Sequence, residues 1–215
     1  MKPNNIKSTN LSNGYVSTSA VSAASKTAMS LYVNIDNGVV FNGVSKVETA
    51  NIAADNGTIH IVDTVIDLPT VVTFATADPN FSILVDALTR ETDFTYVATL
   101  STPNGTSPAP FTVFAPTNDA FVDLLGELNV NSLGDINKAT LSSTLNTHVV
   151  AGANVLESSL SDNMPVSTLG GSLTVNITSN GATLTDSKGR VSNIIATDVQ
   201  ANNGVIHAIR KVVLE

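Results

Sequence analysis

The chain has three histidines, His60, His148 and His207, and these are its only imidazoles. An imidazole could act as a general base, and Asp119 could orient His148 as the second member of such a pair. No Gly-x-Ser-x-Gly elbow, glycine-rich phosphate loop or His-Glu-x-x-His helix accompanies them. The sequence therefore predicts no catalytic residue and a protein that is not an enzyme.

Two of the histidines lie in β-branched, apolar surroundings. His60 and His207 each close an Asn-Gly-x-Ile-His stretch, and Val205, Ile209 and Val213 share the strand face of His207. A histidine in such a row is more often packed and hydrogen-bonded in a core than used as a ligand or a base. We expect structural roles for both.

Oxygen donors gather in two stretches, Asp186–Gly189 and Asp198–Asn203, but neither has the spacing of a calcium loop. Turn formation accounts equally well for their Asp, Asn and Gly residues. The chain has no cysteine, which excludes disulfides and thiolate metal sites. We expect no metal site and no cofactor.

The composition limits the classes of partner. Of 215 residues, 18 are acidic and 10 are basic, so the net charge is −8. Without a cluster of Lys and Arg, such a chain is not expected to bind nucleic acid or an anionic membrane. No apolar run approaches the roughly 20 residues that span a bilayer, so no transmembrane segment is predicted. Met1–Asn5 leads into polar sequence without the apolar segment of a signal peptide.

The last stretch of the chain repeats an earlier one. Asn56–His60 and Asn203–His207 are 147 residues apart (203 − 56) and share their pattern. A separation of this size is typical of a duplicated domain. Further matches relate Ser45 to Ser192, Val47 to Ile194, Ile52 to Val199, Leu31–Ile35 to Leu173–Ile177, Asn5-Ile6 to Asn154-Val155 and Leu11-Ser12 to Leu160-Ser161.

The repeat predicts how the chain is divided. On this alignment Met1 falls opposite Val150, in the middle of the second copy. Residues 1–69 are therefore predicted to be the C-terminal, β-rich half of a preceding domain, and residues 70–215 a complete domain. Pro69 marks the boundary, because proline cannot donate to a continuing β-ladder. We expect a longer protein, and self-association through the uncovered apolar faces of the first half.

Helical patterns come first in the second copy, and strand patterns follow Gly152. This order is typical of an α+β domain. The expected elements are a helix opened by Asp78-Pro79 with the stripe Phe81, Leu84, Val85 and Leu88, a short helix or strand over 93–100, a loop over 101–110, a strand and a helix within 111–128 capped by Thr117 or Asn118, and a helix over 135–149.

Three landmarks, Phe111–Phe121, Leu145–Val150 and Asn203–Leu214, together resemble the fasciclin-like domain family. The resemblance implies a wedge-shaped α+β fold, in which helices pack beside a β-sandwich-like core, in tandem copies on secreted or surface-anchored chains. It also implies adhesion to matrix, receptors or polysaccharide without catalysis. The residues that carry the motif are Phe111, Phe114, Pro116, Thr117, Asn118, Asp119, Phe121, Asn203, Gly204, Ile206 and His207.

Thr147 and His148 are the candidate partner-binding residues. The family often has Tyr-His here, a pair linked in some animal members to receptor binding, whereas this chain has Thr-His. The replacement of Tyr weakens that receptor contact. Because His148 also falls on an apolar helical face, a core position is the alternative interpretation.

Two functions remain open. The first is an extracellular or cell-surface adhesion module that binds a protein or matrix partner. The alternative is a glycan-binding module, which usually offers aromatic platforms beside polar groups. The chain has no Trp, and its only tyrosines are Tyr15, Tyr32 and Tyr96. This scarcity favours adhesion to protein or matrix partners.

Overall fold

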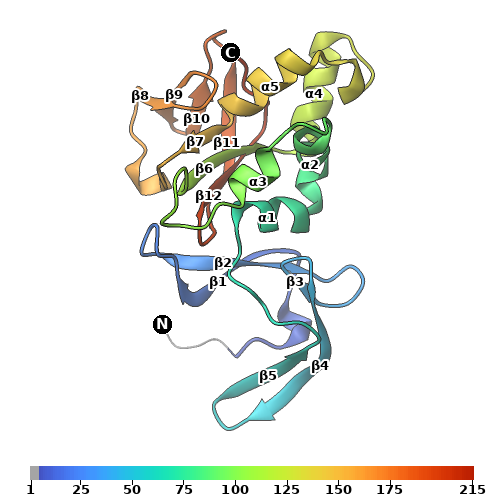
Figure 1. Ribbon diagram of the computed structural model, residues 1–215. Coiled ribbons are helices and arrows are strands. Elements are labelled where there is room, and N and C mark those ends of the chain that lie inside the picture. The colour runs from blue at the N-terminus through green and yellow to red at the C-terminus, as the bar shows by residue number, and fades with distance from the viewer. Residues whose placement is uncertain (1–4) are drawn as a thin grey trace.

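The computed structural model describes residues 5–215 as two β-sheets and a layer of helices (Figure 1). The N-terminal sheet consists, in spatial order, of β1 (Gly14–Val21), β2 (Ala28–Asn34), β3 (Val40–Phe41), β4 (Ser45–Ala54) and β5 (Gly57–Val62). The second sheet consists, in spatial order, of β7 (Val149–Ala151), β6 (Phe111–Pro116), β12 (Gly204–Ile209), β11 (Val191–Gln200), β10 (Gly181–Thr185), β9 (Ser172–Thr178) and β8 (Met164–Ser167).

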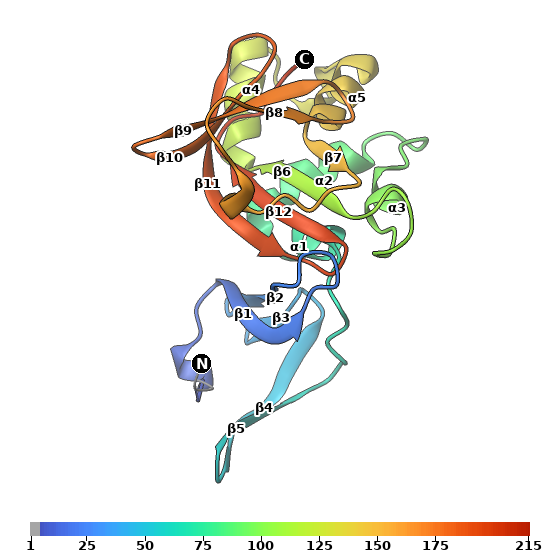
Figure 2. The same cartoon turned by 90° about the vertical axis from the view of Figure 1, so that its left-hand side faces the viewer.

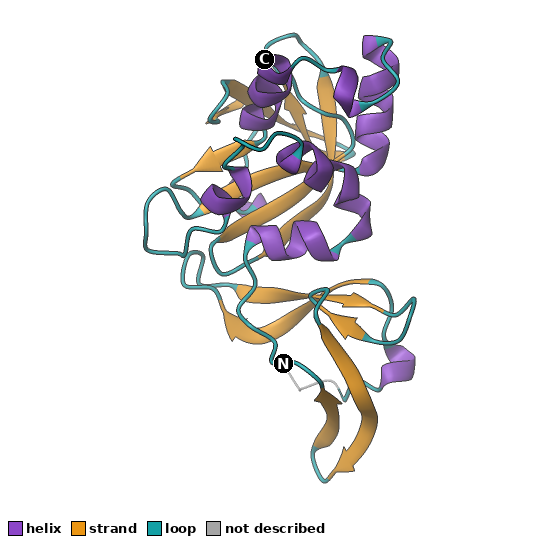
Figure 3. Ribbon diagram, turned by 45° about the vertical axis from the view of Figure 1, so that its right-hand side comes forward, coloured by secondary structure: helices purple, strands orange, loops and turns teal. Residues whose placement is uncertain are grey.

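The helices lie together on one side of the second sheet (Figure 3). They are α1 (Val71–Ala77), α2 (Ser82–Thr89), α3 (Tyr96–Leu100), α4 (Asn118–Leu128) and α5 (Lys138–Thr147). Short 3-10 helices span Ser8–Asn10, Pro79–Phe81, Leu133–Asp135 and Glu157–Ser159. Helices beside a largely antiparallel sheet confirm the α+β prediction. Residues 1–4 of the predicted first half lie outside the described residues.

Successive side chains of β6 and β12 point to opposite faces of the second sheet, and each face has its own hydrophobic core. Phe111 and Val113 of β6 and Ile206 of β12 face the helices, where they meet side chains such as Phe121. Phe114 faces the opposite way into a second core, which consists of Phe114, Val150, Val166, Leu173, Val175, Leu184, Ile209 and Val213. Because Val150 and Val166 come from opposite ends of the strand order, the sheet curls around this core. The sandwich-like core is thus one curled sheet.

The structure decides the type of one predicted element and shortens another. The residues over 93–100, which fitted a helix or a strand, contain α3. The helix predicted over 135–149 is too long, because α5 spans Lys138–Thr147. Asn137 caps it by accepting a hydrogen bond from the Ala139 amide at 2.8 Å, and Val149 already belongs to β7.

The starts of α2 and α4 show a capping arrangement that the sequence did not reveal. Asp78 caps the 3-10 helix Pro79–Phe81 that precedes α2, by accepting a hydrogen bond from the Asn80 amide at 3.0 Å, as expected of a cap before proline. Thr117 occupies the N-cap position of α4, but its side chain makes no capping bond. Asn118 instead accepts from the Ile83 amide at 3.0 Å and donates to the Pro79 carbonyl at 2.9 Å. It therefore caps α2 from the neighbouring helix.

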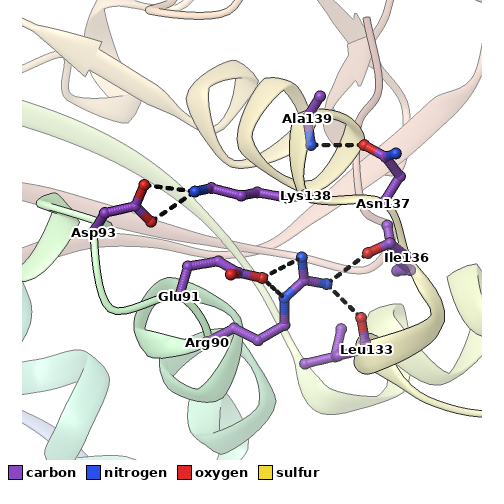
Figure 4. Close-up of polar contacts among 8 residues, drawn as sticks. All are labelled: Arg90, Glu91, Asp93, Leu133, Ile136, Asn137, Lys138 and Ala139. Atoms are coloured by element: carbon purple, nitrogen blue, oxygen red, sulfur yellow. Dashed lines mark hydrogen bonds and ion pairs between the residues drawn. The ribbon is translucent and has the colours of Figure 1, made fainter.

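Charged side chains connect the segment after α2 to the start of α5 (Figure 4). Arg90 donates from Nη1 to the carbonyl oxygens of Leu133 and Ile136, the latter at 2.8 Å. Lys138 lies 2.5 Å from the carboxylate of Asp93. The first contact is partly buried and satisfies two backbone carbonyls, whereas the second is exposed and contributes little.

The N-terminal sheet repeats the pairing of the second sheet. Ile52 pairs with Ile59 across β4 and β5, and Val199 pairs with Ile206 across β11 and β12. Asn51 and Asp198, again 147 residues apart (198 − 51), both have positive φ at the same irregularity. The internal repeat in the sequence is therefore also a repeat of strand register.

Candidate functional site

The candidate partner-binding residues Thr147 and His148 are both buried. His148 donates from Nδ1 to the Thr144 carbonyl at 2.7 Å and accepts from the Val213 amide at Nε2, at 3.2 Å. Desolvation lowers the pKa of His148 to about 4, so the imidazole is neutral at pH 7. His148 thus joins α5 to the C-terminal segment, whereas Thr147 donates back to the Ser143 carbonyl within α5 at 3.0 Å. Neither side chain presents a surface to a partner of the folded chain.

The catalytic pair considered from the sequence does not form. Backbone groups occupy both ring nitrogens of His148, so Asp119 does not orient this histidine. Asp119 is exposed in the first turn of α4, where a carboxylate complements the helix dipole. His207 is also buried; burial lowers its pKa, and Nε2 lies 2.8 Å from the Val155 carbonyl.

The motif residues near the end of the chain hold other segments in place. Asn203 accepts from the Val71 amide at 3.0 Å and donates to the carbonyls of Leu100 and Thr102. At Gly204 the backbone passes so close to β6 that a Cβ would collide with the carbonyl oxygen of Phe111. Phe111, Phe114, Pro116, Phe121 and Ile206 are buried. These side chains lie in the interior, and the structural role of the motif stays the prediction made from the sequence.

Asp186–Gly189 forms a turn, whereas Asp198–Gln200 belong to β11 and only 201–203 connect it to β12. Asp186 accepts from the amides of Lys188 and Arg190 through one oxygen and from Leu214 through the other. Asp198 accepts from the Glu157 amide at 2.8 Å. Within residues 5–215, His, Asp and Glu side chains form no group of three that could hold a metal ion.

A cleft of about 540 Å³ lies between the N-terminal sheet and the second sheet. We call it the junction cleft. Volumes of this size are typical of binding sites for ligands or for a partner's side chains. Its walls are formed by Asn13, Gly14, Tyr15, Tyr32, Asp78, Asn80, Phe81, Thr117, Asn118, Asp119, Ile195, Ala196, Val199, Ala208 and Arg210. Three of the motif residues, Thr117, Asn118 and Asp119, thus border it.

Tyr15 joins the two walls of the junction cleft. Its hydroxyl donates to the Asp78 carboxylate at 3.0 Å, and its ring packs edge-on against Phe74, with centroids 5.4 Å apart. The ring of Tyr32 also lies beside that of Tyr15, with centroids 5.0 Å apart. Burial, reinforced by the negative charge of Asp78, raises the pKa of Tyr15 far above its usual value. The phenol therefore stays protonated and keeps donating to Asp78.

A second polar contact fixes the same junction. The backbone amide of Gln200 donates to Ser30 Oγ at 3.1 Å, and its side-chain Nε2 donates to Ser22 Oγ at 3.2 Å. Gly43 approaches α1 so closely that a Cβ would lie 3.1 Å from Ala77. Because several specific contacts join the two sheets, the junction cleft has defined walls.

The polar groups of the junction cleft are suited to recognition. Asp78 is buried and already bonded to Tyr15 and Asn80, whereas Asp119 and Arg210 are exposed. An exposed carboxylate and an exposed guanidinium can pair with opposite charges of a partner. The sequence offered no signal for this site, because Tyr15 and Asp78 are 63 residues apart and meet only when the two sheets pack.

Comparisons with known proteins agree with this fold. The family model of the Fasciclin domain matches residues 1–69 and 79–215. Two proteins of Synechocystis sp. are similar: Protein sll1483 is 35% identical over 150 residues, covering 67% of this chain and 79% of its own length, and Uncharacterized protein sll1735 is 33% identical over 151 residues, covering 68% and 98%. A solved FAS1 domain pair from the insect cell adhesion molecule Fasciclin I superimposes with a TM-score of 0.58 at 19% identity, covering 94% of this chain and 67% of that one.

Proposed function

Because the chain belongs to the Fasciclin domain family, we propose that it is a non-enzymatic adhesion module of an extracellular or cell-surface protein. The module binds a protein or matrix partner at the junction cleft. One observation carries this proposal: the cleft is built from both sheets, its walls are joined by the hydrogen bond between Tyr15 and Asp78, and it exposes Asp119 and Arg210. A site with fixed walls and exposed charges can recognise a partner without chemistry.

The roles of the histidines support a binding function. His148 and His207 are buried and bonded to backbone groups, which leaves neither free to act as a base on a substrate. The similar structure comes from a protein whose description is a cell adhesion molecule. Over residues 5–215, no helix is long and apolar enough to cross a bilayer.

Bead attachment tests the proposal with two charge reversals on one helix. Asp119 borders the junction cleft, whereas Asp123 is exposed one turn further along α4 and does not border it. Beads carrying the chain are scored for clustering with one another and for attachment to a layer of cultured cells. Asp119→Lys is expected to reduce attachment several-fold, and Asp123→Lys to leave it unchanged.

Thermal unfolding of both variants provides the control for stability, because Asp119→Lys also loses a favourable helix-dipole contact of about 0.5 kcal/mol. Attachment no greater than that of bare beads contradicts the adhesion proposal. Equal losses in the two variants contradict the assignment to the junction cleft.

Binding of a glycan in the same cleft is the second candidate, because its volume and its Asn, Asp and Arg lining suit a sugar. The tyrosines do not favour it. Tyr32 is buried, and the Tyr96 hydroxyl is bonded to Ser142 and Asn146 outside the cleft. A glycan array decides: signal that disappears in Asp119→Lys supports the glycan, and an array without signal excludes the glycans it carries.

A further inference from the structure

The outer edge of β5 is open among residues 5–215, whereas the corresponding edge of β12 is covered. β12 pairs with β11 on one side and with β6, in parallel, on the other. β5 pairs only with β4 within the described residues. The β4–β5 hairpin projects away from the rest of the molecule (Figure 2). An open strand edge offers unpaired amide and carbonyl groups to another chain segment.

The side chains next to this edge are apolar and uncovered. Ile59 and Ile61 are 52% and 46% exposed, whereas their counterparts Ile206 and Ala208 are 1% and 7% exposed. Ile206 and Ala208 are covered by the helices that pack on β6 and β12. The apolar face of β5 thus corresponds to the face of β12 that the helices cover, but no helix covers it among the described residues.

A cavity of about 300 Å³ lies on the other side of the N-terminal sheet, beside His60. Its apolar lining includes Leu11, Val16, Leu31, Val33 and Phe41. The repeat and the strand pairing match these residues to Leu160, Val166, Leu173, Val175 and Leu184. In the second sheet those side chains pack around Phe114. The cavity therefore has the place that an aromatic ring fills in the second copy.

Within the described residues, His60 lacks the aromatic neighbour that His207 has. The His207 ring stacks on Phe114 with centroids 5.8 Å apart, and its Nδ1 accepts from the Asp198 amide at 3.4 Å. The His60 ring keeps the matching bond of Nε2, to the Ile6 carbonyl at 3.0 Å. Its Nδ1, however, is buried and has no partner in the described part of the chain. A buried nitrogen without a partner destabilises the local structure.

We infer that β5 and the cavity beside His60 receive the front half of another fasciclin unit, a polypeptide with the chemistry of residues 70–149. Its strand pairs in parallel with β5 and places an aromatic ring opposite His60, as Phe114 lies opposite His207. Its amphipathic helices cover Ile59 and Ile61. The inference includes the division of the chain at residue 69 and is independent of the junction cleft.

A second copy of this chain is a poorer occupant. Its own β6 is already paired with β7 and β12, so both edges of that strand are used. Two β5 edges could pair with each other, but that pairing would deliver no aromatic ring into the cavity. Only a separate front half satisfies the edge, the apolar face and the cavity together.

The test appends a second copy of residues 70–149 directly before Met1 of the full chain. This junction is chosen because the repeat places Met1 opposite Val150, the residue that follows 149. Hydrogen exchange of the β5 amides is expected to slow by about a hundredfold or more, because the open edge becomes paired. In the NMR spectrum, the ring protons of His60 are expected to move upfield under the added aromatic ring.

Two single changes within the appended copy sharpen the test. Phe114→Ala in that copy empties the cavity again, so the His60 shift is expected to vanish and the protection of β5 to fall. Val122→Ala, at an exposed position of the same segment, is the matched control and is expected to change neither.

Three results would overturn the inference. The first is an appended copy that leaves β5 exchanging as fast as before, whether or not the copy itself becomes protected. The second is equal behaviour of the two changed copies. The third is a dimer of the unextended chain with protected β5 amides that Ile61→Lys converts to monomer, which would identify a second copy as the occupant. None of these bears on attachment through Asp119.

Discussion

The hairpins β4–β5 and β11–β12 have the same register and opposite surroundings. Both carry a positive φ at the same place, Asn51 in one and Asp198 in the other. Ile59 is exposed on the first hairpin, whereas Ile206 is buried on the second beneath the helices. The residue type and the pairing are alike, so the difference in burial comes from what packs against each hairpin.

This comparison separates local from non-local causes of structure. Strand alternation and the turn residues act within a hairpin, and they recur wherever the sequence recurs. Burial depends on segments far away in the chain: β6 and the helices reach β12 but not β5. A substitution at paired positions of the two hairpins therefore measures the contribution of the cover alone.

The glycines that open β5 and β12 should give the largest difference. A Cβ at Gly204 would collide with the Phe111 carbonyl oxygen, whereas nothing lies within 4 Å of one at Gly57. Gly204→Ala is expected to destabilise the chain by about 3 kcal/mol, because backbone cannot move aside cheaply. Gly57→Ala should change stability by less than about 0.5 kcal/mol. Urea unfolding followed by circular dichroism measures both, and equal effects would contradict the comparison.

Acid should act on the covered region, because its histidines are buried. The pKa of His148 is lowered from 6.5 to about 4. Between these two pH values the unfolded chain binds a proton on this imidazole and the folded chain does not. The stability contributed by the neutral imidazole is present above pH 6.5 and is lost as the pH falls toward 4. The expected loss is about 3 kcal/mol.

Urea unfolding at pH 7.5 and pH 4.5 measures that loss. His148→Gln, which cannot take up a proton, is the control and should flatten the dependence on pH. His207 adds to the loss in the same direction, because burial lowers its pKa as well. A stability that does not change between the two pH values would contradict the buried, neutral state of both rings.

The asparagines of the two turns should differ by an intermediate amount. Asn203 bonds to Val71, Leu100 and Thr102, whereas Asn56 is exposed and makes no side-chain hydrogen bond to the described residues. Asn203→Ala is expected to cost about 2 kcal/mol, since it leaves buried backbone groups unpaired. Asn56→Ala should be close to neutral. Differential scanning calorimetry of the two variants tests this, and a loss at Asn56 as large as at Asn203 would show that the first turn is also covered.

The sequence predicted several elements whose causes are local, although it missed α1 with its capping box of Thr70 and Thr73, and it missed the arrangements that depend on packing. The strand that contains His207, the cap at Asp78 and the α+β order followed from alternation, from capping residues and from turn signals. The capping of α2 by Asn118 was missed, because it requires knowing that α4 lies beside α2. The junction cleft was missed for the same reason. Tyr15 had no visible relation to Asp78 until the two sheets came together.

A pair of serines tests whether the two hairpins are equally well formed in solution. Ser45 and Ser192 are both buried, and each donates to a backbone carbonyl 19 residues ahead, of Thr64 at 2.6 Å and of Lys211 at 2.9 Å. These bonds do not involve the cover, so Ser45→Ala and Ser192→Ala should each cost about 1 kcal/mol. Hydrogen exchange of the amides around each serine measures the two costs separately. A cost at Ser192 without one at Ser45 would mean that the uncovered hairpin opens locally before the rest of the chain unfolds, and that the cover is needed for its stability as well as for its burial.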